Sequence, residues 1–169
     1  MNKILSKRFY SENVAEIVVE APLIARSRKA GHFVIVRVDE HGERMPLTIS
    51  DADVKQGTIT LVVQRIGVSS SKLCDLNAGD SVADLVGPLG KATDIRQFGT
   101  VVCACGGVGA APMLPIAQAL KSAGNRVITV LAARNKDLII LYDQLAAVSD
   151  EVIVMTDDGS LGQKGLVTE

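Results

Sequence analysis

The sequence predicts a small antiparallel β-barrel followed by a doubly wound parallel α/β sheet. Up to about residue 90 the chain holds short β-branched runs separated by turns, whereas after residue 99 apolar strands alternate with helical segments. Hydrophobic residues make up 47% of the chain and aromatic residues only 3%. A core of Val, Ile, Leu and Ala follows, which is typical of a parallel sheet buried on both faces. We therefore predict two domains, residues 1–90 and 91–169.

The first half contains five strand candidates. The run 58–64 alternates and is β-branched, and Gly87-Pro88-Leu89-Gly90 ends the set. Pro46 in the third candidate indicates an edge or irregular strand, because proline cannot donate to a sheet ladder. The spacing of these runs is typical of a small barrel. The candidates span residues 15–20, 32–38, 44–50, 58–64 and 81–86.

The second half reads as strand–helix–strand–helix–strand, which predicts parallel strands with right-handed crossovers. Gly124 is the expected stop of the first helix. Three strands make a thin sheet, and Glu169 falls where another helix is expected, so we expect a fragment truncated at its C-terminus. The predicted strands are 100–105, 127–132 and 151–155, and the predicted helices are 113–123 and 138–148.

Composition excludes several classes of protein. The chain has 18 basic and 19 acidic residues, a net charge of -1 and no basic tract, so nucleic-acid binding has no electrostatic support. We expect no signal peptide, and the sequence has no apolar stretch long enough to span a bilayer. Its three cysteines lack a disulfide-framework spacing, and we expect a soluble, reduced, cytoplasmic protein. His32 and His41 are interpreted as structural.

A glycine-rich turn follows the strand at 100–105. Gly106, Gly107 and Gly109 permit a tight turn and the approach of a pyrophosphate, and the following helix offers free N–H groups. Pro112 suits the first helical turn. Pro112 also stands where the dehydrogenase fingerprint has its third glycine, so the pattern departs from that fingerprint. The alternative is a plain strand-to-helix turn.

Two acidic residues, Asp157 and Asp158, follow the last predicted strand. Ligands of open α/β sheets bind beyond the carboxyl ends of the strands, where an acid can accept hydrogen bonds from a ribose diol. The same acid would repel a 2′-phosphate, which favours NAD over NADP. The alternative is a solvated acidic turn. Arg134, after the preceding strand, lies on a loop that either frames the same ligand or only caps the next helix.

Two segments of the barrel half are candidates for a phosphate site. Arg44 can fork onto a phosphate, Pro46 would stiffen the strand, and Thr48 offers a hydroxyl. The segment 67–73 is rich in small residues, including Gly67, Ser69 and Ser70, and leads into a predicted short helix. The alternatives are a surface arginine and a serine-rich loop without a ligand.

These segments, in this order together with Gly-Pro-Leu-Gly at 87–90 and residues 156–165, resemble one family over essentially the whole chain. It is the ferredoxin–NADP reductase superfamily. The resembling branch includes the electron-transfer subunits of NAD-dependent dihydroorotate dehydrogenase and the small subunits of NADH-dependent ferredoxin:NADP oxidoreductase.

The resemblance implies an FAD-binding barrel and an NAD(H)- or NADP(H)-binding domain that move electrons to an iron–sulfur centre. No side chain acts as a classical catalytic residue, since hydride transfer belongs to the flavin. Arg44 would hold the FAD pyrophosphate, Thr48 would lie near the isoalloxazine, and Asp157 and Asp158 would lie at the ribose end of NAD(H). The implied cofactor-binding set is Arg44, Pro46, Leu47, Thr48, Gly67, Ser69, Ser70, Gly106, Gly107, Gly109, Pro112, Arg134, Asp157 and Asp158.

The resemblance also implies a 2Fe–2S cluster on a cysteine-rich C-terminal segment absent from this sequence. Cys103 and Cys105 fall on a predicted buried strand and are interpreted as core residues, so no metal ligand is expected here. The implied partners are a larger flavin, iron–sulfur or dehydrogenase subunit and a ferredoxin-type carrier. Two alternative functions are a flavin-free NAD-dependent dehydrogenase and a non-catalytic nucleotide-binding adaptor.

Overall fold

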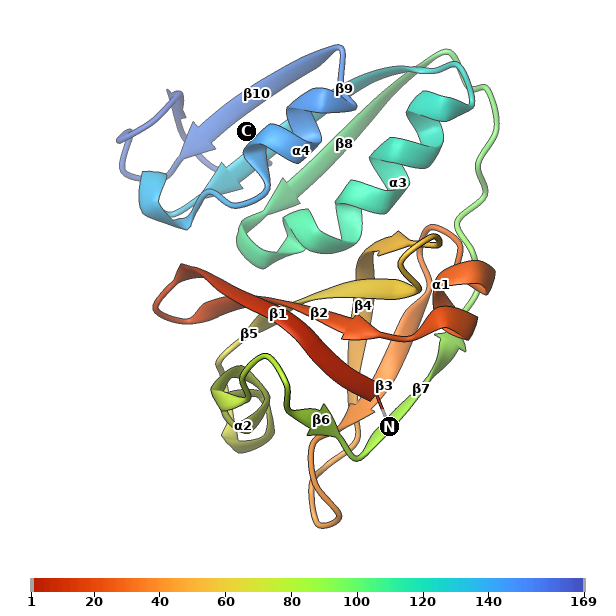
Figure 1. The fold of residues 1–169 in the computed structure, drawn as a ribbon. Coiled ribbons are helices and arrows are strands. Elements are labelled where there is room, and N and C mark those ends of the chain that lie inside the picture. Colours follow the sequence, from red (N-terminus) through yellow and green to blue (C-terminus); the bar gives the residue numbers. More distant parts are fainter. Residues whose placement is uncertain (1, 169) are drawn as a thin grey trace. The chain divides into compact units, whose positions relative to one another are not determined.

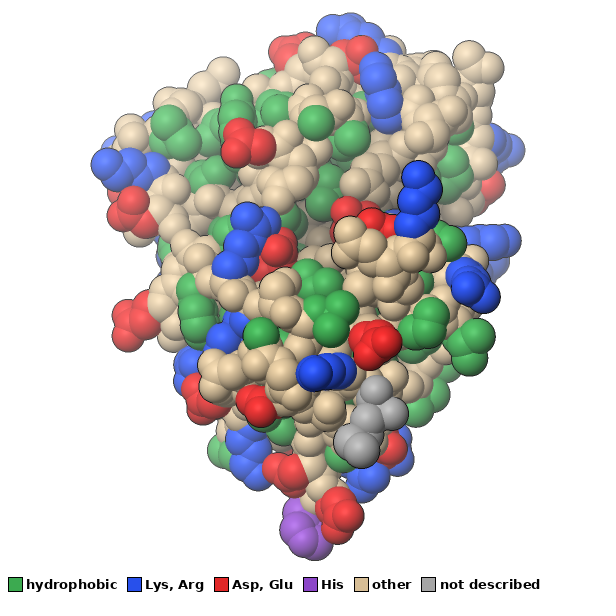
Figure 2. All heavy atoms as spheres, viewed as in Figure 1, with side chains coloured by type: hydrophobic (Ala, Val, Ile, Leu, Met, Phe, Trp, Pro, Cys, Tyr) green, Lys and Arg blue, Asp and Glu red, His purple; other side chains and the backbone are tan. Residues whose placement is uncertain are grey.

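The chain forms two compact units, Met1–Thr93 and Asp94–Glu169, in a computed structural model that describes residues 2–168. Figure 1 labels the elements of both, and each unit is described here by itself. Among the described residues, no helix is long and apolar enough to cross a membrane. On the face drawn in Figure 2, acidic and basic side chains are interspersed rather than gathered by sign.

The first unit is a seven-stranded antiparallel sheet with two short helices, α1 (Pro22–Ser27) and α2 (Val68–Asp75). The strand order is β6-β1-β2-β5-β4-β3-β7. The strands are β1 (Asn2–Ser11), β2 (Val14–Glu20), β3 (Phe33–Arg37), β4 (Met45–Asp53), β5 (Thr58–Gln64), β6 (Ser81–Val82) and β7 (Asp84–Leu89).

The sheet curls into a nearly closed barrel because its two end strands are consecutive in the chain. Only Ala83 separates β6 from β7, and its N–H donates to the carbonyl of Val38 at 3.2 Å. The predicted strand at 81–86 is therefore two strands with different partners, β1 and β3. The barrel core is aliphatic, as the composition indicates, and its largest fully buried side chains are Ile4, Ile17, Ile49, Ile59, Leu61, Leu73, Val19, Val34, Val36 and Val63.

Strand β4 changes partner along its length, which explains how it accommodates Pro46. Its first four residues pair with β3, and residues from Ile49 onward pair with β5 after a register shift between Ile49 and Asp51. Pro46 lies in the half that pairs on one side only, opposite Ile35. The irregular strand inferred from Pro46 is thus confirmed, but β4 lies inside the sheet order rather than at its edge.

The second unit is a four-stranded parallel sheet in the order β11-β10-β9-β8. Helices α3 (Ala110–Ser122) and α4 (Tyr142–Ala147) both lie on one face of it, α3 against β8 and β9 and α4 against β9 and β10 (Figure 1). The strands are β8 (Thr100–Gly106), β9 (Arg126–Ala133), β10 (Glu151–Thr156) and β11 (Gln163–Lys164), and the 3-10 turns are η1 (Gly107–Gly109) and η2 (Lys136–Leu138).

Two expectations for this unit are corrected. The predicted helix 138–148 is split, because Leu141 has a left-handed backbone with φ of 58° and α4 begins only after it. The sheet also has four strands rather than three, since Gln163 and Lys164 pair in parallel with Met155 and Thr156. The predicted helix stop is confirmed: α3 ends at Ser122 and Gly124 adopts φ of 84°.

Alternate side chains of β8 are buried and exposed. Cys103 and Cys105 are 3% and 6% exposed, while Val102, which precedes Cys103, is 64% exposed. Burial raises the pKa of both thiols, that of Cys105 to about 11. Within residues 2–168, β8 pairs with β9 alone and is therefore an edge strand.

Candidate nucleotide-binding sites

Arg44 immediately precedes β4, and its guanidinium is paired with a carboxylate. Its Nη2 atom lies 3.1 Å from Oδ2 of Asp84, and the same oxygen is 2.6 Å from Nη2 of Arg37. Arg44 keeps 54% of its side chain exposed, against 27% for Arg37. Two arginines thus share one acid, and the outer one is accessible to an anionic ligand.

The start of β4 and the start of α2 are neighbours, although they are distant in sequence. The hydroxyl of Ser69 donates to Oε2 of Glu43 at 3.0 Å, a contact across 26 residues. Because Glu43 adjoins Arg44, the two phosphate-site segments predicted from the sequence lie side by side in the same unit. The Ser69 hydroxyl is engaged by that carboxylate.

Gly67 caps the N-terminus of α2 in an extended conformation that any residue adopts, with φ of -138° and ψ of -174°. No non-neighbouring described atom lies within 4 Å of the position that a Cβ would take there. Neither backbone nor packing therefore requires glycine at this point. The hydroxyl of Ser70 accepts from the N–H groups of Ile66 and Gly67, both at 3.0 Å, so it braces the loop. The first-turn N–H groups of α2 have no partner within the helix.

Within β4, neighbouring side chains face opposite ways, as in any strand. Leu47 packs against the barrel core, whereas Pro46 is exposed and Thr48 is half-buried. A ligand outside the barrel would thus meet Pro46 and Thr48 by their side chains and Leu47 only by its backbone.

The glycine turn of the second unit lies between β8 and α3. Gly107 has φ of 52°, a left-handed conformation that favours glycine. Gly109 is different: its φ of -62° and ψ of -14° are ordinary helical values, and no non-neighbouring described atom lies within 4 Å of its Cβ position. The backbone at Gly109 does not need a glycine, and the space beside it is open. A ligand that contacts the backbone of a helix start closely requires such open space. Pro112 is the third residue of α3, where an N–H is unpaired in any case.

The strand register brings the remaining predicted residues of this unit to the same sheet edge. Gly106, Ala132 and Met155 are aligned across β8, β9 and β10. The glycine turn, the loop with Arg134 and the loop with Asp157 and Asp158 therefore all emerge at the carboxyl ends of adjacent strands. The N–H groups of Asp157 and Asp158 donate to the carbonyls of Ala133 and Arg134, at 3.1 and 3.2 Å, which ties the two loops together.

The two acids differ in what holds them. The Asp158 carboxylate accepts from the N–H of Ser160 at 2.9 Å, and hydrogen bonding with Ser160 holds its pKa below the ordinary value. Within the part of the chain that the structure describes, neither the Asp157 carboxylate nor the Arg134 guanidinium has a hydrogen bond or ion pair. Asp158 braces its own loop, whereas the Asp157 carboxylate and the Arg134 guanidinium are free to meet a ligand.

Several residues that shape these sites were not found from the sequence. Asp84 and Glu43 engage Arg44 and Ser69, and Thr156 and Ser160 tie the loop after β10. No local pattern marks Asp84 or Glu43, because each acts through a contact that only the folded chain creates. Thr156 and Ser160 lie in the segment 156–165 that carries the family resemblance, but that resemblance assigned no role to either residue.

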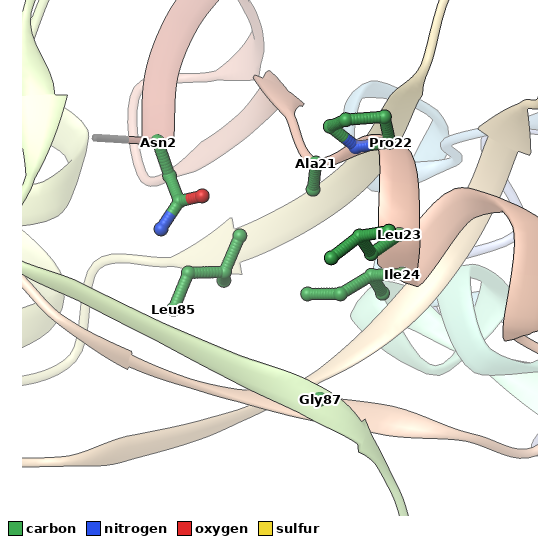
Figure 3. A pocket seen from close by; sticks show the side chains of 7 residues that line it. All are labelled: Asn2, Ala21, Pro22, Leu23, Ile24, Leu85 and Gly87. Carbon is green, nitrogen blue, oxygen red and sulfur yellow. The ribbon is translucent and has the colours of Figure 1, made fainter.

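The barrel also has a pocket of about 260 Å³ that contains none of the predicted site residues. In Figure 3, the Asn2 amide faces a mostly apolar wall from the β2–α1 corner and β7. The lining residues are Asn2, Ala21, Pro22, Leu23, Ile24, Leu85 and Gly87.

Known proteins of similar sequence cover the whole chain. It is 41% identical over 169 residues to a dihydroorotate dehydrogenase B (NAD(+)) electron transfer subunit homolog of Thermotoga maritima, which covers 100% of this chain and 60% of the relative. It is 34% identical over 171 residues to the corresponding electron transfer subunit of Streptococcus pneumoniae, covering 98% of this chain and 67% of the relative. No protein-family model matches the chain.

Solved structures agree with the fold. An NADH-dependent reduced ferredoxin-NADP oxidoreductase, studied for flavin-based electron bifurcation, superposes with a TM-score of 0.94 at 40% identity, covering 99% of this chain and 60% of that chain. The cytochrome b5 reductase domain of Ulva prolifera nitrate reductase, at 19% identity and a TM-score of 0.75, covers 98% of this chain and 77% of that domain and shares the fold.

The chain spans 60% of the length of the Thermotoga relative and 67% of the Streptococcus relative. Its barrel and parallel sheet, in this order, are those of the ferredoxin–NADP reductase fold. From sequence and fold together, the chain belongs to the family of dihydroorotate dehydrogenase B (NAD(+)) electron transfer subunits, within the ferredoxin–NADP reductase superfamily.

Proposed function

We propose that this chain is the FAD- and NAD(H)-binding part of an oxidoreductase that moves electrons between a nicotinamide and an iron–sulfur partner. The observation that carries the proposal is a pair of glycines, Gly67 and Gly109, at which the fold itself requires no glycine. Each stands at a helix start, one in each unit, as two nucleotide sites would require.

The barrel residues fit FAD. Arg44 would hold the pyrophosphate, and the first-turn N–H groups of α2 would complete the cradle beside Gly67. Thr48, whose side chain is directed away from the core, would lie near the flavin ring. Because Asp84 already pairs with Arg44, binding exchanges that carboxylate for a phosphate, while Arg37 keeps Asp84 compensated. Bound FAD supplies the chemistry, by accepting a hydride and releasing electrons singly.

The second unit fits NAD(H). The Gly106–Gly109 turn and the start of α3 would receive its pyrophosphate, and Asp157 would accept hydrogen bonds from the ribose diol. The unpaired Asp157 carboxylate would repel a 2′-phosphate, whereas the unpaired Arg134 guanidinium would attract it. We propose that Asp157 prevails and that NAD is preferred over NADP.

The iron–sulfur centre is proposed to lie outside this chain. A 2Fe–2S cluster takes four ligands, most often cysteines, and this chain has three cysteines, all buried. Within residues 2–168, no group of three or more His, Cys, Asp or Glu residues could hold a metal. We propose that a larger partner subunit would carry the final acceptor; the relatives are named as electron transfer subunits of a dehydrogenase. Isolation of the whole protein alone, with full acceptor reduction, would contradict this.

The decisive experiment is an absorption spectrum of the chain after incubation with FAD and removal of free cofactor. We expect the visible bands of bound oxidised flavin, and their bleaching by NADH without oxygen. Binding of NADH without retained flavin would instead favour a flavin-free dehydrogenase or an adaptor.

A further inference from the structure

The hydroxyl of Thr156, the last residue of β10, forms a closed clamp with one residue of the following loop. Its Oγ1 atom donates to the carbonyl of Leu161 at 2.8 Å and accepts from the N–H of Leu161 at 3.1 Å. Thr156 is 0% exposed, so the hydroxyl end of the clamp is buried, while Leu161 is 44% exposed. Its own carbonyl accepts from the N–H groups of Gly159 and Gly165, at 3.1 and 3.2 Å.

A second set of contacts ties the tip of this loop to η2, the turn that follows β9. The N–H of Lys136 donates to the Ser160 hydroxyl at 2.8 Å. Gly162 then passes so close to β10 that a Cβ would lie 2.1 Å from the carbonyl oxygen of Val154. The backbone from Thr156 to Gly162 is thus fixed at three points, which are Thr156, Ser160 and Gly162.

Asp157 and Arg134 stand at this edge with opposite, unpaired charges. Which of them a 2′-phosphate meets depends on where the Asp157 carboxylate is held, because like-charge contact at a partly desolvated site is strongly unfavourable. A loop free to move would let the carboxylate turn aside and leave the phosphate to Arg134. Discrimination therefore needs the loop to be rigid.

We propose that Thr156 is a positioning residue that sets nucleotide specificity, its clamp on Leu161 holding Asp157 where it excludes a 2′-phosphate. This inference rests on the proposed NAD(H) site and adds the residue that makes the site selective. Valine has nearly the shape of threonine but cannot form the clamp, and serine retains the hydroxyl.

The test measures dissociation constants of ADP-ribose and 2′-phospho-ADP-ribose by calorimetry on the flavin-loaded protein. These probes lack the nicotinamide, so they do not reduce the flavin. We expect tighter binding of ADP-ribose, and an affinity ratio that falls about tenfold in Asp157→Ser. Thr156→Val should lower the ratio by at least about threefold, and Thr156→Ser should keep it near the wild-type value.

The ratio of the two affinities distinguishes a positioning role from a loss of folded protein. Unfolding would weaken the binding of both probes equally and leave the ratio unchanged. An unchanged ratio in Thr156→Val, with a lowered ratio in Asp157→Ser, overturns the role of Thr156 and leaves the proposed function standing. An unchanged ratio in Asp157→Ser, or no binding of either probe by the wild type, overturns the proposed site itself. If Thr156→Val does not fold, Ser160→Ala decides, since it removes the exposed tie to Lys136; an unchanged ratio there also counts against the inference.

Discussion

The two units offer an anionic ligand opposite kinds of surface. In the barrel the candidate groups are already engaged, Arg44 by Asp84 and Ser69 by Glu43. At the edge of the parallel sheet, Gly109 is bare and Asp157 is unpaired within the described residues. In the proposed sites, Arg44 would exchange one anion for another, whereas Gly109, like Gly67 of the barrel, offers open backbone. Mutations should affect the two sites in different ways.

The largest effect should appear in thiol labelling, because each unit carries its own buried cysteines. Cys74 lies in the barrel and Cys103 and Cys105 in the sheet, and burial raises the pKa of all three thiols. A ligand at 100 times its Kd slows opening-limited labelling about 100-fold. FAD should protect Cys74, and NAD(H) the other two, as measured by mass spectrometry. Equal protection of all three by either ligand would mean that the two units open as one.

Arg44→Ala should weaken FAD binding by about 1.5–3 kcal/mol, the loss of a charge-assisted contact. The matched control is Arg8→Ala, since Arg8 has the same 54% side-chain exposure and is likewise paired, with Glu16. Asp84→Asn should act in the opposite direction, because it frees Arg44 from its competitor. Flavin fluorescence titration measures all three. Equal losses in Arg44→Ala and Arg8→Ala would refute the phosphate role of Arg44.

Gly67→Ala and Gly109→Ala should each weaken one ligand only, on the order of tenfold, since a methyl group would occupy the ligand's place. The stability of Gly109→Ala should not fall, because its backbone is helical and its Cβ position is open. FAD and ADP-ribose titrations of both variants, with thermal melts, test the pair. A crossed effect, with Gly109→Ala weakening FAD, would show that the two surfaces are not separate.

The smallest effect should be the lowered pKa of Asp158, in the loop after β10, which an acid titration measures. The pKa of Asp158 is lowered by its hydrogen bonds with Ser160, so its ionised form is favoured in the folded chain. Its contribution is present above the unfolded pKa of about 3.9 and is lost as the pH falls through the lower folded value. NMR of the Asp158 carboxyl should show the depressed midpoint, and Ser160→Ala should raise it. An Asp158 titration midpoint that is unchanged in Ser160→Ala would contradict the bracing role of Asp158.

Elements with a continuous apolar run or a clear periodicity could be predicted from the sequence. Strands β8, β9 and β10 and helix α3 were found close to their observed bounds. Strand β1 was missed, because Ile4 is the one fully buried position among its ten residues and the apolar pattern is weak. Strand β11 consists of two exposed residues and exists only through pairing with β10, which no local pattern encodes.

The features of the candidate sites also divide into those that could be predicted from the sequence and those that could not. Glycine turns and an arginine two residues before a proline are visible in the sequence, because their chemistry depends on residue type and near neighbours. The counter-charges are not visible: Asp84 is 40 residues from Arg44, and Glu43 is 26 residues from Ser69. The Thr156–Leu161 clamp spans only five residues within the recognised segment 156–165, but the sequence does not show which residue the threonine hydroxyl contacts.

The free edge of β8 has a practical consequence for anyone who purifies this chain. The barrel conceals its sheet ends because β6 and β7 adjoin, but within residues 2–168 β8 pairs with β9 alone, beside a 64% exposed Val102 and without lysine or proline in the strand. Such edges recruit strands from other molecules. Concentrated samples should therefore aggregate through residues 100–106 before the barrel loosens, and a lysine at position 102 is the direct remedy.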